Sequence, residues 1–139
     1  MVYCGGDADK YSYNPVSHNF IELCNISTQD LNLNGLYLHY TEGTVSPRQW
    51  ITLPLTGTIK AGSTFLIKGA PCAVYDTNTT IIRVGEPDMY WTKEATKNPT
   101  ILEIDTNELK HSIWDENGYL KLAQKCSIYL SGGYEQVEQ

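Results

Sequence analysis

The sequence lacks the long apolar runs and the basic clusters that would assign it to a membrane or to nucleic acid. No segment approaches the roughly 20 consecutive apolar residues of a membrane-spanning helix, and the opening MVYCGGDADK has no signal-peptide pattern. The ten Lys and Arg residues are scattered, and the formal net charge of −6 repels phosphate backbones. We therefore expect a soluble chain that does not bind nucleic acid.

The short motifs that mark common active sites are also absent. The sequence has no G-x-S-x-G, H-E-x-x-H, G-x-x-x-x-G-K-[ST] or G-x-G-x-x-G pattern. His18, His39 and His111 stand far apart, and Cys72 could act as a nucleophile with His39 as its base only if the fold brought the two together. The sequence thus predicts no enzyme, no catalytic residues and no cofactor, and it makes a small-molecule ligand an unfavoured interpretation.

Cysteine is scarce and widely spaced. Cys4, Cys24, Cys72 and Cys126 form no C-x-x-C pair of the kind that binds zinc. We favour buried thiols that pack as small apolar side chains. Disulfide pairs in an oxidising compartment are the alternative.

Two acidic segments offer the oxygen ligands that calcium prefers. Asp7 and Asp9 lie in GGDADK, and Asp115, Glu116 and Asn117 lie in WDENG, but neither segment has the twelve-residue spacing of an EF-hand. We favour solvated loops over a metal site. Two N-glycosylation sequons, which begin at Asn25 and Asn78, are also expected to lie in surface turns.

What the sequence does contain is a series of short segments with alternating apolar residues. Strands are expected at Asn19–Leu23, Gly35–Tyr40, Gln49–Leu53, Ser63–Lys68, Thr80–Val84, Ile101–Ile104, Tyr119–Ala123 and Ser127–Leu130. Turn signals rich in Gly, Asn and Pro separate them, a spacing typical of an all-β sandwich with mostly antiparallel strands. At most one short helix is expected, at Thr106–His111. Residues 1–133 then form one domain, and residues 134–139 form a polar acidic tail or the start of a linker.

Two tight turns are predicted to need glycine. Asn117-Gly118 can form a type I′ hairpin turn in which both residues have positive φ, and Gly62 reverses the chain between Lys60 and Ser63. The alternation around these turns predicts one core that contains Leu23, Leu38, Ile59, Phe65 and Ile67.

The segments FIELCN, LNLNGLYL and WITLPLTGTIKAGSTFLIKG resemble the lamin-tail domain family, in particular its bacterial and phage-borne branch. The signature of that family combines an IELYN strand, a dLsGW.L strand and a l.GtI.aG.yfLI strand-turn-strand unit. The resemblance covers Phe20–Gly69 closely, although Cys24 stands where the signature has an aromatic residue and Leu36-Tyr37 replaces its Gly-Trp. Met1–Asn19 is similar to the opening strand and glycine-containing loop of the family.

The resemblance implies an immunoglobulin-like β-sandwich without an active site. It implies a structural or protein-interaction module within a larger protein or assembly, either as a phage virion component or as an accessory domain of a secreted bacterial hydrolase. Its setting would be extracellular, at the cell surface or in a virion. The resemblance also implies that Leu31 and Leu33 anchor a crossover between strands and that Gly35 occupies a sharp turn.

The candidate partner contact is the irregular segment Gly85–Thr100. This segment loses the alternation of its neighbours, and we expect Met89, Tyr90 and Trp91 to be exposed in it, with Lys93, Glu94 and Lys97 as a polar rim. Tyr and Trp are common anchors of protein interfaces. The alternative is a segment that folds back and caps the core, in which case Trp91 would be buried by its own chain.

Overall fold

The structure is a computed structural model that describes residues 1–3, 16–42, 49–72, 82–100, 104–105, 110–111, 113–123 and 126–132. The predictions for Cys4, Asp7, Asp9, Asn78 and the tail at 134–139 concern residues outside this set. The described part of the chain is all-β and contains no helix, so none of it forms a helix that could cross a membrane.

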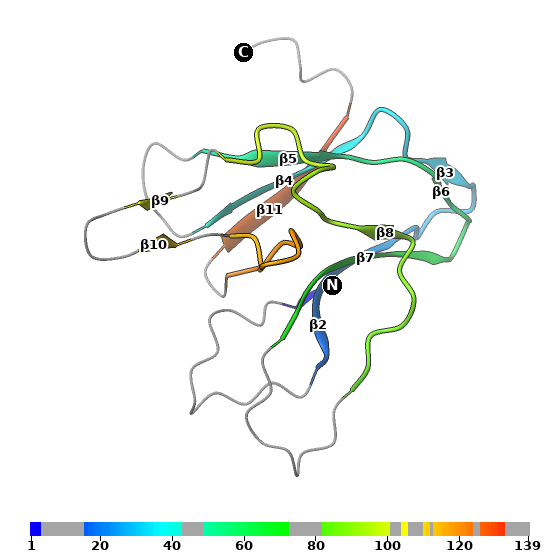
Figure 1. The fold of residues 1–139 in the computed structure, drawn as a ribbon. Coiled ribbons are helices and arrows are strands. Elements are labelled where there is room, and N and C mark those ends of the chain that lie inside the picture. The colour runs from blue at the N-terminus through cyan, green and yellow to red at the C-terminus, as the bar shows by residue number, and fades with distance from the viewer. Residues whose placement is uncertain are drawn as a thin grey trace.

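The strands form several small sheets, whose arrangement Figure 1 shows. The larger ones are a four-stranded sheet in the order β1-β2-β7-β8 and a three-stranded sheet in the order β11-β4-β5; β3 pairs with β6 and β10 with β9. All pairs are antiparallel except β7 with β8. The bounds are β1 Val2–Tyr3, β2 His18–Cys24, β3 Leu31–Asn32, β4 Tyr37–Glu42, β5 Ile51–Pro54, β6 Thr58–Ile59, β7 Thr64–Pro71, β8 Met89–Tyr90, β9 Ile104–Asp105, β10 Lys110–His111 and β11 Cys126–Ser131.

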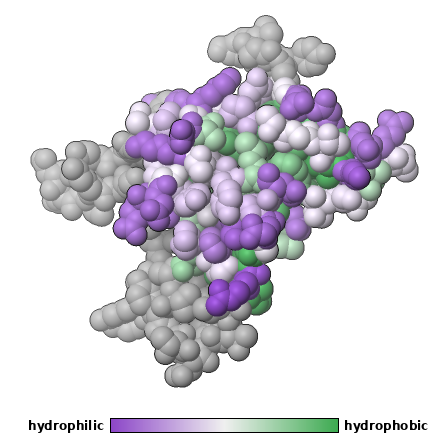
Figure 2. All heavy atoms as spheres, turned by 45° about the vertical axis from the view of Figure 1, so that its right-hand side comes forward, coloured by the Kyte–Doolittle hydropathy of each residue, from purple (hydrophilic) through white to green (hydrophobic). Residues whose placement is uncertain are grey.

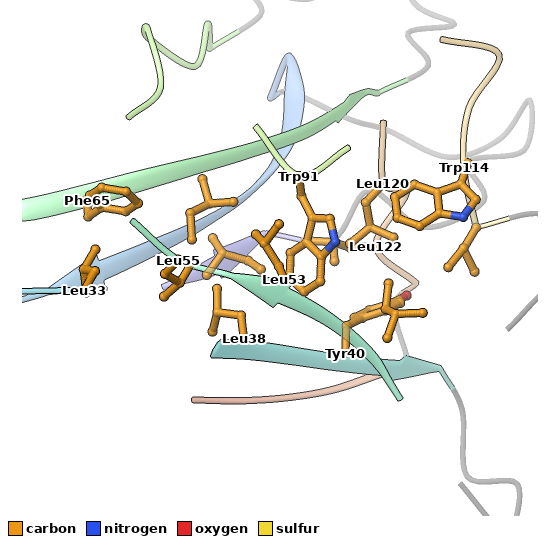
Figure 3. Close-up of a cluster of buried hydrophobic side chains, with 14 of the residues drawn as sticks. Leu33, Leu38, Tyr40, Leu53, Leu55, Phe65, Trp91, Trp114, Leu120 and Leu122 are labelled. Atoms are coloured by element: carbon orange, nitrogen blue, oxygen red, sulfur yellow. The ribbon is translucent and has the colours of Figure 1, made fainter. Parts of the chain in front are cut away.

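One apolar core joins the two larger sheets. Buried side chains alternate along β5 and through the first parts of β2, β4 and β7, as period-2 strands with one covered face require. In the second half of β7, Ile67 to Ala70 are all buried. Figure 3 shows side chains of β4 and β5 facing those below β7. The predicted core is confirmed for Leu38, Ile59, Phe65 and Ile67, while Leu23 is partly buried against the same cluster.

The polar segment between β2 and β4 is held by the side chain of Asn25. This residue is 5% exposed, and its Nδ2 donates to Gln29 O at 2.8 Å and to Ile59 O at 2.9 Å. Its Oδ1 accepts hydrogen bonds from the main-chain N and the Oγ of Ser27. The segment therefore makes its turns with its own polar side chains, as Asn and Ser commonly do.

The crossover meets the core through one of its two leucines. Leu33 is fully buried, as expected, whereas Leu31 in β3 is 39% exposed and does not anchor the segment. Gly35 has φ of 89° in a turn closed by the hydrogen bond from Leu36 N to Leu33 O at 3.0 Å. The prediction of a sharp turn at this glycine is confirmed.

The late hairpin forms, but its turn differs from the predicted one. Gly118 has φ of 83°, while Asn117 does not have positive φ, so the type I′ prediction is wrong. Hydrogen bonds from Gly118 N to Asp115 O and from Asp115 N to Tyr119 O close a three-residue loop. Such a loop combines a type I turn with a left-handed glycine. Positive φ is confirmed at Gly118 and also at Gly62, where φ is 73°.

Other predicted elements are shorter or different. Lys110 and His111 form β10 opposite Asp105 and Ile104, so the helix prediction is wrong at these two positions, and residues 106–109 lie outside the described set. In the stretch expected as a strand at Thr80–Val84, the described residues contribute only an isolated bridge between Val16 and Ile82. A strand of one or two residues is too short for an alternation of apolar and polar residues to be recognised in the sequence.

Candidate functional site

The segment that we expected to face a partner contributes its largest side chain to the core. Trp91 is 1% exposed, and its ring lies edge-on to Tyr40 with centroids 6.2 Å apart. Figure 3 shows it projecting into the interior beside Leu53 and Leu122. The expectation that Trp91 is exposed is therefore wrong, because the apolar space between the sheets takes up the indole.

Hydrogen bonds fold the rest of this segment against β5. The indole Nε1 of Trp91 donates to Thr96 Oγ1 at 2.9 Å, which satisfies its buried N–H. Lys97 N donates to Thr52 O at 2.9 Å, and Asn98 Nδ2 donates to Trp50 O at 2.5 Å. This is the capping arrangement that the sequence left open as the alternative.

Tyr90 remains at the surface. It is 41% exposed and its ring lies 5.4 Å from that of Tyr119, whereas Met89 on the opposite side of β8 is partly buried against the core. Lys93, Glu94 and Lys97 are exposed. On the side of the molecule that carries β3, β6 and β8, Figure 2 shows apolar atoms bordered by hydrophilic ones. Tyr90 alone of the three predicted contact residues is thus a prominent surface aromatic.

The residues considered for catalysis do not come together. Both ring nitrogens of His39 lie against hydroxyls, Nδ1 against Thr52 Oγ1 at 2.9 Å and Nε2 against Ser131 Oγ at 2.7 Å. Burial raises the pKa of the Cys72 thiol to about 11, the opposite of what a thiolate nucleophile needs. Neither residue therefore has the surroundings that a Cys–His catalytic pair requires.

The acidic hairpin loop uses its carboxylate to build the turn. Asp115 Oδ1 accepts hydrogen bonds from Asn117 N and Tyr119 N, both at 2.9 Å. In the described part of the chain, no three His, Cys, Asp or Glu side chains gather as metal ligands would. The role of Asp115 in the loop is therefore explained without a metal ion.

The prediction that the cysteines are buried thiols is confirmed only in part. No disulfide joins Cys24, Cys72 and Cys126, and Cys72 and Cys126 are partly buried. Cys24 is exposed at the end of β2, so the expectation that it packs as a small apolar side chain is wrong. The alternation of β2 ends before this residue, and the chain turns there into the polar crossover.

A small void lies beside Trp91, lined by Phe20, Ile21, Ile67, Gly69, Trp91, Leu120 and Leu122. It holds about 10 Å³, roughly one water molecule, and its lining offers apolar side chains only. The void is a packing defect of the core, since a ligand would need more space and polar groups to orient it.

The surface feature with the most defined geometry lies on the outer face of the three-stranded sheet. Tyr129 of β11 stacks on His39 of β4, with centroids 4.3 Å apart and planes at 20°. Trp50, next to β5, meets the same tyrosine edge-on at 4.9 Å. We call Trp50, His39 and Tyr129 the aromatic face.

The geometry of the sheet explains why these rings gather. Leu38 and Tyr40 of β4 point into the core, so His39 between them points outward, and the ladder places Tyr129 directly opposite His39. The ring nitrogens of His39 are fixed by hydroxyls from both neighbouring strands. The rings are therefore held in a fixed arrangement while Tyr129 stays 46% exposed.

A cation extends this face at one side. The Nζ of Lys97 lies 4.8 Å from the centroid of the Tyr37 ring, within the range of a cation–π interaction. Tyr37 is the outward residue of β4 next to His39 in the alternation, opposite Ser131 of β11. The surface thus combines hydroxyls and one ammonium group with aromatic rings, and the aromatic residues are the ones that are enriched in protein interfaces.

Sequence reasoning missed the aromatic face because its members come from separate segments. Trp50, His39 and Tyr129 meet only through the non-local order β11-β4-β5. A usable signal was the alternation of Ser127–Leu130, which sets Ser127 and Tyr129 on one side of the strand and Ile128 and Leu130 on the other. The alternation of Ser127–Leu130 does not show which other strand pairs with this segment.

Comparisons with protein-family models, with curated proteins and with solved structures returned no match for this chain.

Proposed function

We propose that this chain is a non-catalytic protein-interaction module of the lamin-tail type, with an immunoglobulin-like β-sandwich fold. The segments that carry the resemblance support this proposal: FIELC of the first segment lies in β2, LNLNGLYL spans β3 and the start of β4, and the third segment spans β5, β6 and most of β7. Their apolar residues share one core with the two larger sheets, which is the packing that a sandwich requires.

The aromatic face is the observation that carries the interaction role. Tyr and Trp side chains at a surface supply a large contact area at a small entropic cost; Tyr129 is exposed and Trp50 is partly exposed. The stacking of Tyr129 on His39 reduces that cost further. Hot spots of protein interfaces are enriched in these residue types. The proposed partner is therefore a protein that contacts Trp50 and Tyr129, in place of the Trp91 contact expected from the sequence.

The test separates binding from folding. Trp50→Ala and Tyr129→Ala are expected to leave the melting temperature almost unchanged and to weaken co-purification with the parent assembly by at least about tenfold, the effect of a loss of about 1.4 kcal/mol. Tyr90→Ala is the matched control, since Tyr90 is an aromatic residue of similar exposure on the other large sheet. If Tyr90→Ala weakens association and the other two do not, the aromatic face is excluded as the contact.

Cross-linking then identifies the partner protein and the larger protein or assembly to which this chain belongs. A photo-reactive phenylalanine analogue in place of Tyr129 is expected to capture the partner, while the same analogue in place of Tyr90 is not. The two settings implied by the lamin-tail resemblance give different captured proteins: a structural protein of a phage particle or the catalytic portion of a secreted hydrolase. Capture from position 90 alone would contradict the proposed site.

A further inference from the structure

A lysine ammonium is buried on the outer face of the four-stranded sheet. Lys68 lies in β7, between β2 and β8, and it follows Ile67, whose side chain points into the core, so Lys68 leaves the sheet on the opposite side. Lys68 is nevertheless only 8% exposed. Its Nζ donates to Val84 O and to Gly85 O, both at 3.3 Å. An ammonium has three N–H donors, so one of them has no acceptor among the described residues.

No described carboxylate forms an ion pair with this ammonium. Asp88 uses its Oδ2 to accept the hydrogen bond from Leu66 N at 2.7 Å. Glu86 is exposed, and Glu22 of β2 lies opposite Leu66, one position away from Lys68 in the ladder. A buried charge that meets only carbonyl oxygens is costly unless an anion completes its surroundings.

His18 provides a second polar group beside Lys68. Its Nδ1 lies 2.8 Å from Ser17 Oγ, a hydroxyl that also accepts the hydrogen bond from Val84 N at 2.8 Å. These contacts hold the ring next to the segment whose carbonyls bind Lys68. Burial and the positive charge of Lys68 lower the pKa of His18. When the ring is protonated, Nδ1–H donates to Ser17 Oγ, and Nε2–H has no acceptor among the described residues.

The surroundings of these two donors are open and carry further positive charge. A Cβ built on Gly85 would meet no atom within 4 Å, so there is space beside the carbonyl that binds the ammonium. Arg83, two residues earlier, is exposed. Cys72 donates its N–H to Ser17 O at 2.9 Å, and its thiol stays neutral because burial raises its pKa to about 11. A small anion can therefore approach without displacing a side chain.

We propose that Lys68 and His18 bind a single oxyanion group, either a carboxylate or a phosphate. The third N–H of Lys68 and the Nε2–H of His18 are its donors, and hydrogen bonds between charged groups are the strong ones. The anion also offsets the repulsion between the ammonium and the protonated ring. The site lies on a different sheet from the aromatic face, so it stands or fails independently of the proposed function.

The experiment follows the ring signals of His18 by NMR in the complete chain. The pKa of His18 is measured in chloride, in sulfate as a probe for phosphate, and in formate as a probe for a carboxylate, all at one ionic strength. An oxyanion that binds here favours the charged ring and is expected to raise this pKa by at least about 0.5 at saturation. A response to sulfate alone identifies a phosphate site, and a response to formate identifies a carboxylate site.

The same spectra contain an internal control. His39 lies on the other large sheet with both ring nitrogens against hydroxyls, and its signals are expected not to move with either anion. This titration uses the unmodified chain, so it does not depend on the folding of a variant. A His18 pKa that is the same in chloride, sulfate and formate overturns the proposal.

A pair of lysine variants tests the role of the ammonium. Lys68→Gln removes the charge and is expected to weaken the binding of the anion by at least about tenfold. Lys60→Gln is the matched control, because Lys60 is exposed in the turn before β7, at the opposite end of that strand from His18. It removes the same charge from the chain and is expected to bind as the parent does. Retained binding in Lys68→Gln, or an equal loss in both variants, contradicts the assigned site.

Discussion

The main chain at Gly69 and the carbonyl of Leu120 lie too close for any larger residue at position 69. A Cβ built on Gly69 would stand 2.5 Å from Leu120 O, an oxygen that also accepts the hydrogen bond from Ala70 N at 2.8 Å. This contact ties β7 to the late hairpin, two parts of the chain that pack on the same core. Gly69 is therefore required for its size, because its φ is not positive.

Gly69→Ala is expected to destabilise the chain by about 1 to 3 kcal/mol, the usual cost of forcing an extra methyl group into a packed site. The main chain of Leu120 cannot move away without losing its bond to Ala70. Gly85→Ala is the control, since nothing lies within 4 Å of a Cβ at Gly85. Chemical denaturation of both variants tests this. Equal midpoints for Gly69→Ala and the parent chain would show that β7 and the hairpin do not meet in this way.

Burial of Trp91 predicts that it acts on stability. Trp91→Ala is expected to cost about 3 to 5 kcal/mol, whereas Tyr90→Ala, one residue earlier and 41% exposed, is expected to cost well under half of that. Thermal melting of the two variants measures the difference. An unchanged melting temperature in Trp91→Ala would contradict the burial of Trp91 and would favour the expectation that this residue is exposed and contacts a partner.

The hydroxyl of Thr96 gives a finer test of the same site. Thr96→Val keeps the volume but leaves the indole N–H of Trp91 without its acceptor, which is expected to cost about 1 to 3 kcal/mol. The control is Thr58→Val, because Thr58 is exposed in β6. Urea unfolding curves of the two variants are compared. A loss in Thr96→Val no larger than that in Thr58→Val would mean that the indole N–H is not buried with this partner.

The longest strands could be predicted from the sequence because their apolar residues recur at alternate positions. Alternation located most of β2, β4, β7 and β11, and turn chemistry located Gly35, Gly62 and Gly118. Alternation failed where pairing is short, as at β9 and β10, since two residues cannot establish a period. The turn type at Asn117 was wrong because Asp115 Oδ1 bonds two main-chain amides and stabilises a longer loop.

The candidate site was less predictable than the fold for a physical reason. An exposed Trp and a buried Trp look alike in a segment without periodicity, so the local sequence could not place Trp91. Its burial depends on Tyr40 and on the space between two sheets, both distant in the sequence. The aromatic face likewise depends on strand order, which follows from non-local pairing.

The exposed and buried thiols are expected to differ in reactivity. Burial raises the pKa of Cys72 to about 11, so only about 0.1% of it is thiolate near pH 8, while Cys24 is exposed. Iodoacetamide is therefore expected to label Cys24 much faster, as peptide mass spectrometry of timed samples can show. Because the thiolate is the reactive form, labelling of Cys72 should accelerate with pH up to its raised pKa. Comparable rates for both thiols in the folded chain would contradict the burial of Cys72.

Asn25 provides the last prediction, because its side chain is both the centre of the crossover and the first residue of a sequon. Asn25→Asp keeps the shape and the acceptor atoms but removes the Nδ2 donor, so the carbonyls of Gln29 and Ile59 each lose a hydrogen bond. A carboxylate would also stand buried beside those carbonyls. We expect a cost of about 2 to 4 kcal/mol from these two effects.

Asn32→Asp is the matched control for this substitution. Asn32 is exposed, and its Oδ1 accepts the hydrogen bond from Asn34 N, a role that aspartate can keep, so its cost is expected to stay within about 0.5 kcal/mol. Denaturant midpoints of the two variants decide the matter. The same burial predicts that Asn25 carries no glycan in the folded chain, because Nδ2 is already bonded inside. A glycosylated Asn25 in a chain with an unchanged melting temperature would refute the assigned role of this side chain.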